Sequence, residues 1–202
     1  MNAQPGLEVD LLTRGDVGQA LTLFDKRLGV GYVTDAGLGS YILPSDQSVS
    51  AASDDVKAGF VARKDDVVVG AATARLFATP EAFLTSLPSG QQSVVDDAVS
   101  MSGPVGVLQS VAVAEEWSGF GVATALISDA VAWMSGKTAT VVTVGWTDGD
   151  GCHIRGVVTR LGFVEVLRVQ RFWHADALLR GYSCPSCPSA CFCEARVFVA
   201  FT

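Results

Sequence analysis

A glycine-bearing loop at residues 115–123 carries the clearest chemical signal in the sequence, because it joins an expected strand to an expected helix. Gly119 and Gly121 let the backbone turn sharply and let a ligand approach closely. The first N–H groups of a helix have no internal partner, and together with the helix dipole they form an anion site suited to a pyrophosphate. A tight turn that binds no ligand is the alternative interpretation of the same residues.

Two familiar phosphate-binding motifs do not fit this loop. The dinucleotide fingerprint needs a third glycine at the position that Thr124 occupies. The P-loop needs a lysine followed by serine or threonine at the start of the helix, and the loop contains no lysine. Any phosphate bound here is therefore expected to be held mainly by backbone groups.

The second chemical signal is a group of cysteines near residue 190. Four of the five cysteines lie within ten residues of one another: Cys184, Cys187, Cys191 and Cys193. A Cys-x-x-Cys turn presents two sulfurs to one ion, and four thiolates suit tetrahedral Zn²⁺. We expect a structural zinc ion in a cysteine-rich insert at residues 175–193, while two disulfides or an iron–sulfur cluster are the alternatives.

The elements that must position these residues follow from the hydrophobic periodicity. Strands are expected at 7–12, 58–63, 67–77, 105–113, 138–146, 163–173 and 195–201. Helices are expected at 13–28, 32–41, 122–134 and about 150–161. The segment 44–56 is predicted to be a loop. The segment 79–104 is predicted to be a partly helical insertion that borders a substrate pocket, or alternatively a plain surface loop. This order predicts an α/β fold of the α+β type, with a central mixed sheet flanked by helices, in one domain spanning residues 1–202.

Composition excludes several classes of function. Apolar residues make up 49% and charged residues 17%, which favours a folded domain over a disordered chain. A net charge of −7 argues against nucleic-acid binding, which needs clustered basic residues. No apolar run reaches the roughly 20 residues of a membrane span, and no secretory signal is evident, so we expect a cytoplasmic protein without membrane contact.

The glycine loop resembles the acyl-CoA motif of the GNAT N-acetyltransferase superfamily, Arg/Gln-x-x-Gly-x-Gly/Ala. Ser118 stands at the Arg/Gln position, Gly121 at the glycine position and Ala123 at the position of the small residue. The downstream Thr-Arg-Leu-Gly-Phe at 159–163 is similar to the Glu-Lys-Leu-Gly-Phe signature of that family. The resemblance extends over about residues 7–173 and the last strand.

The resemblance implies a GNAT-like sheet and an acyl-CoA-dependent N-acyltransferase, with acetyl-CoA as the co-substrate. It implies that the strand before the loop splays from its neighbour and binds the pantetheine arm, and that the loop amides hold the pyrophosphate. The cofactor-binding residues would be Val111, Ala112, Val113, Ser118, Gly119, Phe120, Gly121, Val122, Ala123 and Thr124. The backbone amide near Val111 would polarise the thioester carbonyl, and the acceptor amine would attack directly.

The resemblance does not supply a side-chain acid or base. The position where many members carry a catalytic tyrosine is Val158, and the usual asparagine aligns with Gly151. Cys152 is interpreted as an ordinary small residue and His153 as a solvated one. A catalytically impaired acyl-CoA sensor and a zinc-stabilised interaction module are therefore the alternative functions. The acceptor, a small-molecule or peptide amine, and the oligomeric state, a dimer included, stay open.

Overall fold

The computed structural model of the chain describes residues 6–44, 55–148, 151–187 and 190–201. The strands are β1 (Leu7–Leu11), β2 (Asp55–Lys64), β3 (Val67–Phe77), β4 (Val105–Val113), β5 (Thr140–Asp148), β6 (Gly151–Cys152), β7 (Val164–Val169) and β8 (Glu194–Phe201). The helices are α1 (Val17–Leu28), α2 (Asp35–Gly39), α3 (Pro80–Thr85), α4 (Gln92–Ala98), α5 (Val122–Met134), α6 (Arg155–Arg160) and α7 (His174–Arg180). Short 3₁₀ turns, η1 (Arg14–Asp16) and η2 (Glu115–Trp117), precede α1 and α5.

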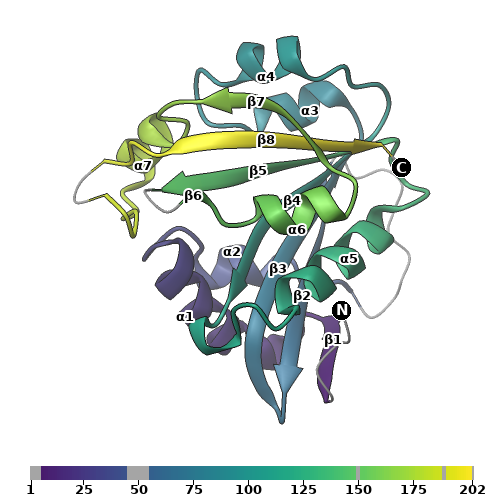
Figure 1. Cartoon of the computed structure of the whole chain (residues 1–202), viewed down its shortest axis with the longest axis vertical. Helices are drawn as coiled ribbons and strands as arrows, with labels where there is room; N and C mark the ends of the chain where they lie inside the picture. Colours follow the sequence, from purple (N-terminus) through teal and green to yellow (C-terminus); the bar gives the residue numbers. More distant parts are fainter. Residues whose placement is uncertain (1–5, 45–54, 149–150, 188–189, 202) are drawn as a thin grey trace.

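The strands form one mixed sheet in the order β1-β2-β3-β4-β5-β8-β7, with β6 paired to β5 (Figure 1). The pair β4–β5 is parallel, and the other pairs are antiparallel. A parallel pair needs a crossover connection, and α5 provides it between β4 and β5. The predicted mixed sheet flanked by helices is thereby confirmed.

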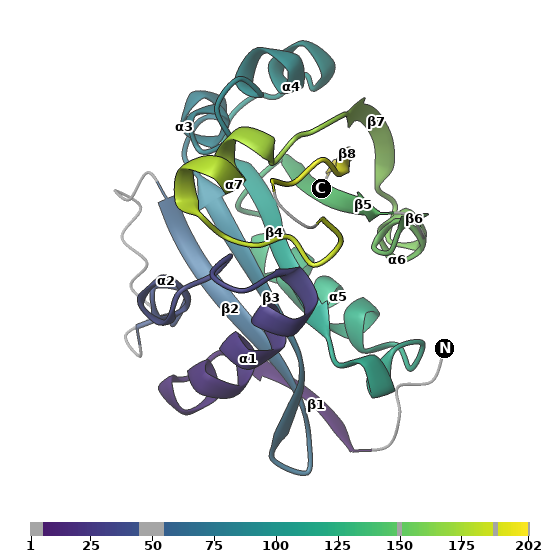
Figure 2. The same cartoon turned by 90° about the vertical axis from the view of Figure 1, so that its left-hand side faces the viewer.

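Helices cover both faces of the sheet because alternate strand residues point to opposite sides. On β2, Phe60 and Ala62 belong to the core under α5, whereas Val61 belongs to the core under α1 and α2. Figure 2 shows α1 and α2 on one side of β2 and β3, and α5 on the other. The helices α3 and α4 pack on a third core that includes the buried Phe83 and Val95. Among the described helices, none is long and apolar enough to cross a membrane.

Local sequence signals explain several boundaries. The Asp16 carboxylate accepts hydrogen bonds from the backbone N–H and the hydroxyl of Thr13, at 2.8 and 2.6 Å, and so closes the start of η1 and α1 as the capping pattern predicted. Asp65 and Asp66 both have positive φ, 49° and 65°, which is the conformation of a tight type I′ hairpin between β2 and β3.

Four expectations need correction. The helix expected at about 150–161 begins only at Arg155, because β6 (Gly151–Cys152) precedes it, and the strand expected at 163–173 ends at Val169. The segment 79–104 is partly helical, as predicted, but its helices pack against the core at the far end of β3 and line no part of the cavity described below. The helix expected at 32–41 is shorter, because α2 covers only Asp35–Gly39. Most of the loop predicted at 44–56 lies outside the described residues.

Candidate functional site

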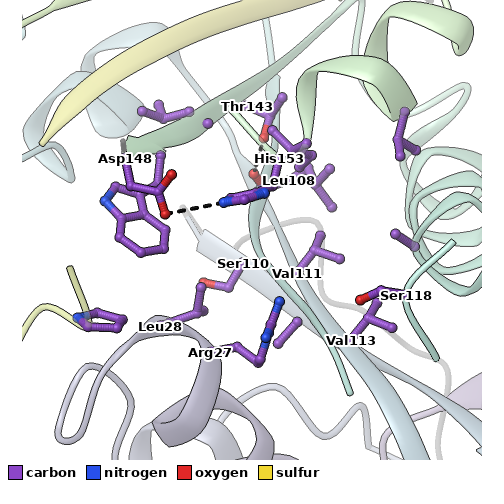
Figure 3. Close-up of a pocket in the computed structure, with 18 of the residues that line it drawn as sticks. Arg27, Leu28, Leu108, Ser110, Val111, Val113, Ser118, Thr143, Asp148 and His153 are labelled. Carbon is purple, nitrogen blue, oxygen red and sulfur yellow. Dashed lines mark hydrogen bonds and ion pairs between the residues drawn. The ribbon is translucent and has the colours of Figure 1, made fainter. Parts of the chain in front are cut away.

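The site begins where the two parallel strands separate. β4 and β5 pair from Val105↔Thr140 to Leu108↔Thr143, after which β4 continues to Val113 and β5 to Asp148 without pairing to each other. At the point of separation, Thr143 Oγ1 donates a hydrogen bond to Leu108 O at 2.9 Å. A cavity of about 650 Å³ occupies the space between the separated strands (Figure 3). This volume lies within the range of small-molecule and cofactor sites.

The register of β4 on β3 determines which backbone groups face this cavity. Ala114 N–H donates to Val69 O at 2.9 Å, and these two residues lie opposite each other in the register that pairs Val113 with Gly70. Hydrogen-bonded and non-hydrogen-bonded pairs alternate along an antiparallel ladder. The backbone groups of Ala112 are therefore directed at β3, whereas those of Val111 and Val113 are directed away from β3, toward the cavity.

A β-bulge bends β4 just before this exposed edge. The register of β3 and β4 shifts between Thr73 and Ala74, so that Gln109 is the extra residue on β4. Tyr41 Oη donates a hydrogen bond to Gln109 Oε1 at 2.8 Å. Burial raises the pKa of Tyr41 to about 12, so this hydroxyl keeps its proton at neutral pH. The bulge aims the following residues of β4 into the gap.

The glycine loop lies beside the free edge of β4. Gly119 and Gly121 have φ values of +83° and +84°, a left-handed conformation that glycine adopts without steric cost. α5 starts directly after Gly121, and Ala125 N–H donates to Gly121 O at 3.0 Å. The N–H groups of Val122, Ala123 and Thr124 belong to the first turn, where a helix offers no internal acceptor. The loop thus has the geometry of an anion site at a helix N-terminus.

Basic side chains outnumber acidic ones along the cavity. Lys26 and Arg27 line it from the end of α1, and Arg160 lines it from α6. Among the described lining residues, Asp148 carries the one carboxylate, and Arg27 lies 3.9 Å from the carboxylate of Glu115, which is exposed and outside the lining. The whole chain carries a net charge of −7, so this local excess of positive charge is not a consequence of composition. It favours an anionic ligand.

On the opposite side of the cavity, His153 lies beside Asp148 (Figure 3). Its Nε2 atom is 3.2 Å from Asp148 Oδ2, and its ring packs 6.5 Å from that of Trp146. β6 pairs antiparallel with β5, which returns the chain over Asp148 and brings His153 to the carboxylate. An imidazole oriented by a carboxylate is a common arrangement for proton transfer.

A tyrosine approaches the exposed edge of β4 from the segment after α1. Tyr32 Oη lies 3.5 Å from Ser110 Oγ, and Ser110 directly precedes Val111. The Tyr32 ring makes an edge contact with that of Tyr182, at 5.5 Å between ring centroids. Burial raises the pKa of Tyr32, so its hydroxyl is protonated at neutral pH.

The four clustered cysteines border the same cavity. The Sγ atoms of Cys184, Cys187, Cys191 and Cys193 all lie within 4.8 Å of one another. Cys184 and Cys191 line the cavity, beside Trp146 and Trp173. The structure therefore brings together the thiols that the sequence grouped. Figure 1 shows the segment that leads into β8 apart from the start of α5, where the glycine loop lies.

The sequence of residues 38–163, more than half of the chain, matches the model of the acetyltransferase (GNAT) family. The chain belongs to this family. No curated protein sequence matches the chain significantly. The cysteine cluster lies outside the part of the chain that matches the GNAT model.

Solved structures with the same GNAT fold cover nearly the whole chain. Arabidopsis thaliana NAA60 in complex with acetyl-CoA has a TM-score of 0.64 at 16% identity, covering 97% of this chain and 99% of that one. Drosophila melanogaster polyamine N-acetyltransferase, which forms N-acetylagmatine, has a TM-score of 0.60 at 15% identity, covering 97% and 100%. The NatC complex bound to Gag peptide and CoA gives 0.61 at 11%, covering 97% and 98%.

Most residues of the predicted CoA site line the cavity of this GNAT fold. They are Val111, Ala112, Val113, Ser118, Gly119, Gly121, Val122, Ala123 and Thr124. Phe120 is the exception, because its side chain is 49% exposed and contacts the ring of Trp117 instead. Val158 is fully buried in the core under α5, so the position of the family's usual tyrosine is a packing position here.

The prediction of a solvated His153 is confirmed, because its side chain is 59% exposed. Sequence reasoning does not place it beside Asp148 at the cavity, and it gives Tyr32 no role. The Asp-Gly-Asp-Gly sequence at 148–151 is a typical turn signal, and it could have indicated that the chain folds back on β5 here. Nothing in the sequence pattern pointed to Tyr32.

Proposed function

We propose that this chain transfers the acetyl group of acetyl-CoA to a primary amine. The observation that carries the proposal is the separation of β4 and β5 beside the glycine loop. It gives one continuous cavity with a free strand edge, a helix N-terminus and an excess of basic side chains. An acyl-CoA matches these features, because the amides of its pantetheine arm can pair with a strand edge, and its phosphates suit a helix N-terminus and basic side chains.

In this proposal the pantetheine arm pairs with the backbone groups of Val111 and Val113, which face the cavity. The pyrophosphate accepts hydrogen bonds from the amides of Gly119 and of the 121–124 segment, as at other helix N-termini. The N–H groups of Ser118 and Phe120, expected to take part, instead donate to Glu115 O and Trp117 O at 3.0 and 3.4 Å. Lys26, Arg27 and Arg160 supply the positive charge around the phosphates. The register directs the backbone of Ala112 at β3, so Ala112 contributes only to the wall of the site.

The chemistry is a direct attack of the neutral amine on the thioester carbonyl carbon. The Val111 N–H stabilises the oxyanion that forms, the new C–N bond is made, and the C–S bond breaks as the intermediate collapses. His153, held by Asp148, accepts the proton that the amine nitrogen loses. Tyr32, which lines the cavity, donates the proton that the leaving thiolate takes up. His153 then releases its proton to the solvent, and Tyr32 regains one from it. His153 and Tyr32 would thus supply the proton transfers that a valine at position 158 cannot perform.

The acceptor is a small-molecule amine or a peptide N-terminus. The structural neighbours include a polyamine N-acetyltransferase and a complex bound to a peptide, which supports both kinds of acceptor. We place the enzyme in the cytoplasm, as one acyl-CoA-dependent domain over residues 1–202 with a cysteine-rich insert at 175–193. A structural zinc ion on the clustered cysteines completes the proposed holoenzyme.

A second candidate is an acyl-CoA sensor without turnover, which the replacement of the usual tyrosine and asparagine by Val158 and Gly151 favours. Two measurements distinguish the enzyme from the sensor. Calorimetry tests whether acetyl-CoA binds, and an assay for free CoA thiol then tests for turnover with agmatine, spermidine and a peptide with a free N-terminus. Binding with thiol release supports the enzyme. Binding without release from any of these amines supports the sensor, and the absence of binding refutes both.

A further inference from the structure

The spacing of the four clustered sulfurs is that of ligands to one ion. Cys193 Sγ lies 3.8 Å from Cys184 Sγ and 3.6 Å from Cys187 Sγ. A tetrahedral ion with metal–sulfur bonds of about 2.3 Å holds its sulfurs about 3.8 Å apart. An iron–sulfur cluster places several metal and sulfide ions between its cysteines, which needs more room than the 4.8 Å that encloses all four sulfurs. The geometry fits a single ion.

We propose that Cys184, Cys187, Cys191 and Cys193 bind one Zn²⁺ ion, and that this ion fixes the wall of the cavity against which the amine acceptor binds. Four thiolates fill a tetrahedral coordination sphere and leave no open position, so the ion is structural. The metal site stands on its own geometry, whereas its role in acceptor binding rests on the proposed acetyltransferase function.

The backbone around the cysteines is folded for metal binding. Cys187 N–H donates to Cys184 O at 3.3 Å, which closes the turn between the first two cysteines. Phe192 N–H donates to Cys187 Sγ at 3.4 Å, and such a hydrogen bond to sulfur favours the thiolate. Cys184, Cys191 and Cys193 are buried, with exposed fractions of 8, 3 and 8%, while Cys187 is half-buried. The ion would be shielded from water and reached from the side of Cys187.

The cysteine segment is docked on the loop that follows α1, across the cavity. Ser183 N–H donates to Val30 O at 3.2 Å. Gly29, with φ of +114°, lies so close to Ser183 O that any side chain at this position would collide with it. The cluster also packs against the aromatic rings of Trp146 and Trp173. Fixing the four sulfurs therefore fixes the contact between the cysteine segment and the loop after α1, and the packing of Trp146 and Trp173 on the cluster.

One residue of the cysteine segment also reaches the proposed base. Ser186 Oγ, between the first two cysteines, lies 3.4 Å from Asp148 Oδ2. The same carboxylate oxygen lies 3.2 Å from His153 Nε2. Loss of the ion would release Ser186 from Asp148 and loosen the acceptor side of the cavity. The CoA side would change less, because the free edge of β4 and the glycine loop belong to other elements, and only Lys26 and Arg27 lie near the docked segment.

The first test is the metal content of the full-length protein grown with zinc. We expect about one equivalent of zinc per chain, and after cobalt exchange the intense visible bands of a tetrahedral thiolate site. Cys187→Ser should lose most of the metal, whereas Cys152→Ser, the matched control outside the cluster, should retain it. Stoichiometric iron, or a denatured protein with only one titratable thiol, would overturn the proposal, because the second result means that the four cysteines form disulfides.

The second test is hydrogen exchange on the wild-type protein before and after removal of the metal with a chelator. We expect faster exchange at the loop after α1, at residues 181–187 and 190–194, and at residues 146–148 and 151–154, with β1 to β3 and the glycine loop unchanged. Unchanged exchange in the first three segments would overturn the role of the ion in the wall. This comparison needs no variant and no identified amine.

Calorimetry with acetyl-CoA on the zinc-bound protein distinguishes the two proposals. We expect the dissociation constant to change less than about twofold when the metal is removed, while the KM for an accepted amine rises about tenfold or more. Acetyl-CoA that fails to bind to a zinc-bound protein would refute the acetyltransferase and leave the metal site standing. If the protein binds acetyl-CoA but has no metal site, the metal proposal is refuted and the acetyltransferase proposal stands.

Discussion

Replacing Gly121 with aspartate should abolish most of the affinity for acetyl-CoA. A Cβ atom at Gly121 meets no other atom within 4 Å, so the variant has room to fold, and aspartate tolerates the left-handed φ of +84° better than most residues. The new carboxylate would lie at the start of α5, where the proposal places the pyrophosphate. Two like charges about 5 Å apart repel by about 3 kcal/mol at an effective dielectric constant of about 20, which weakens binding roughly 200-fold.

Gly121→Asn is the matched control, because asparagine has the same shape, accepts the same backbone conformation and carries no charge. Calorimetry should show a dissociation constant near the wild-type value for asparagine and a large increase for aspartate. Raising the salt concentration to about 1 M shortens the screening length to about 3 Å, so it should narrow the difference between the dissociation constants of the two variants. Equal affinities of the two variants at low salt would refute the assignment of the phosphates to this loop.

Three further outcomes are expected. His153→Ala should lower kcat about 100-fold with acetyl-CoA affinity unchanged, and a normal kcat would remove His153 from proton transfer. Tyr32→Phe should lower kcat by a similar factor and keep the fold, as judged by circular dichroism, and an undiminished rate would show that the thiolate needs no acid from Tyr32. Burial alone would raise the pKa of Asp16, but hydrogen bonds from Arg63 and Thr13 outweigh it and hold the pKa below its usual value. The stability that Asp16 contributes is thus present above about pH 4 and is lost as the pH falls through the lowered pKa of Asp16 in the folded protein. Denaturation at several pH values should therefore show that acid lowers the free energy of unfolding less in Asp16→Asn than in the wild type.

Apart from the mixed sheet, which follows from the order of the elements, the features that the sequence predicted are local ones. The capping of α1 by Asp16, the hairpin turn at Asp65 and Asp66, and the start of α5 after Gly121 each depend on a few neighbouring residues. Backbone conformation and hydrogen bonding within a few residues decide such features, so residue types alone indicate them. The grouping of the cysteines was equally local, because all four lie between residues 184 and 193.

The acceptor side could not be predicted, because its residues meet only in the folded sheet. His153 reaches Asp148 through the pairing of β6 with β5, and Tyr32 reaches Ser110 across 78 positions of sequence. The positive charge of the cavity likewise combines Lys26 with Arg160, which come from helices on different parts of the chain. Periodicity assigns each of these residues to an element but not to a neighbour in another element.

The position of β8 has a consequence for how the protein forms during translation. β8 follows β7 in the chain but lies between β5 and β7 in the sheet. Until residues 194–201 leave the ribosome, β5 exposes an unpaired edge and β7 has no strand to pair with. The apolar residues of β5, with Val141 and Val142 fully buried in the native protein, are then open to aggregation or to chaperones. This half of the sheet, which carries the proposed base, must therefore assemble after synthesis of the first half.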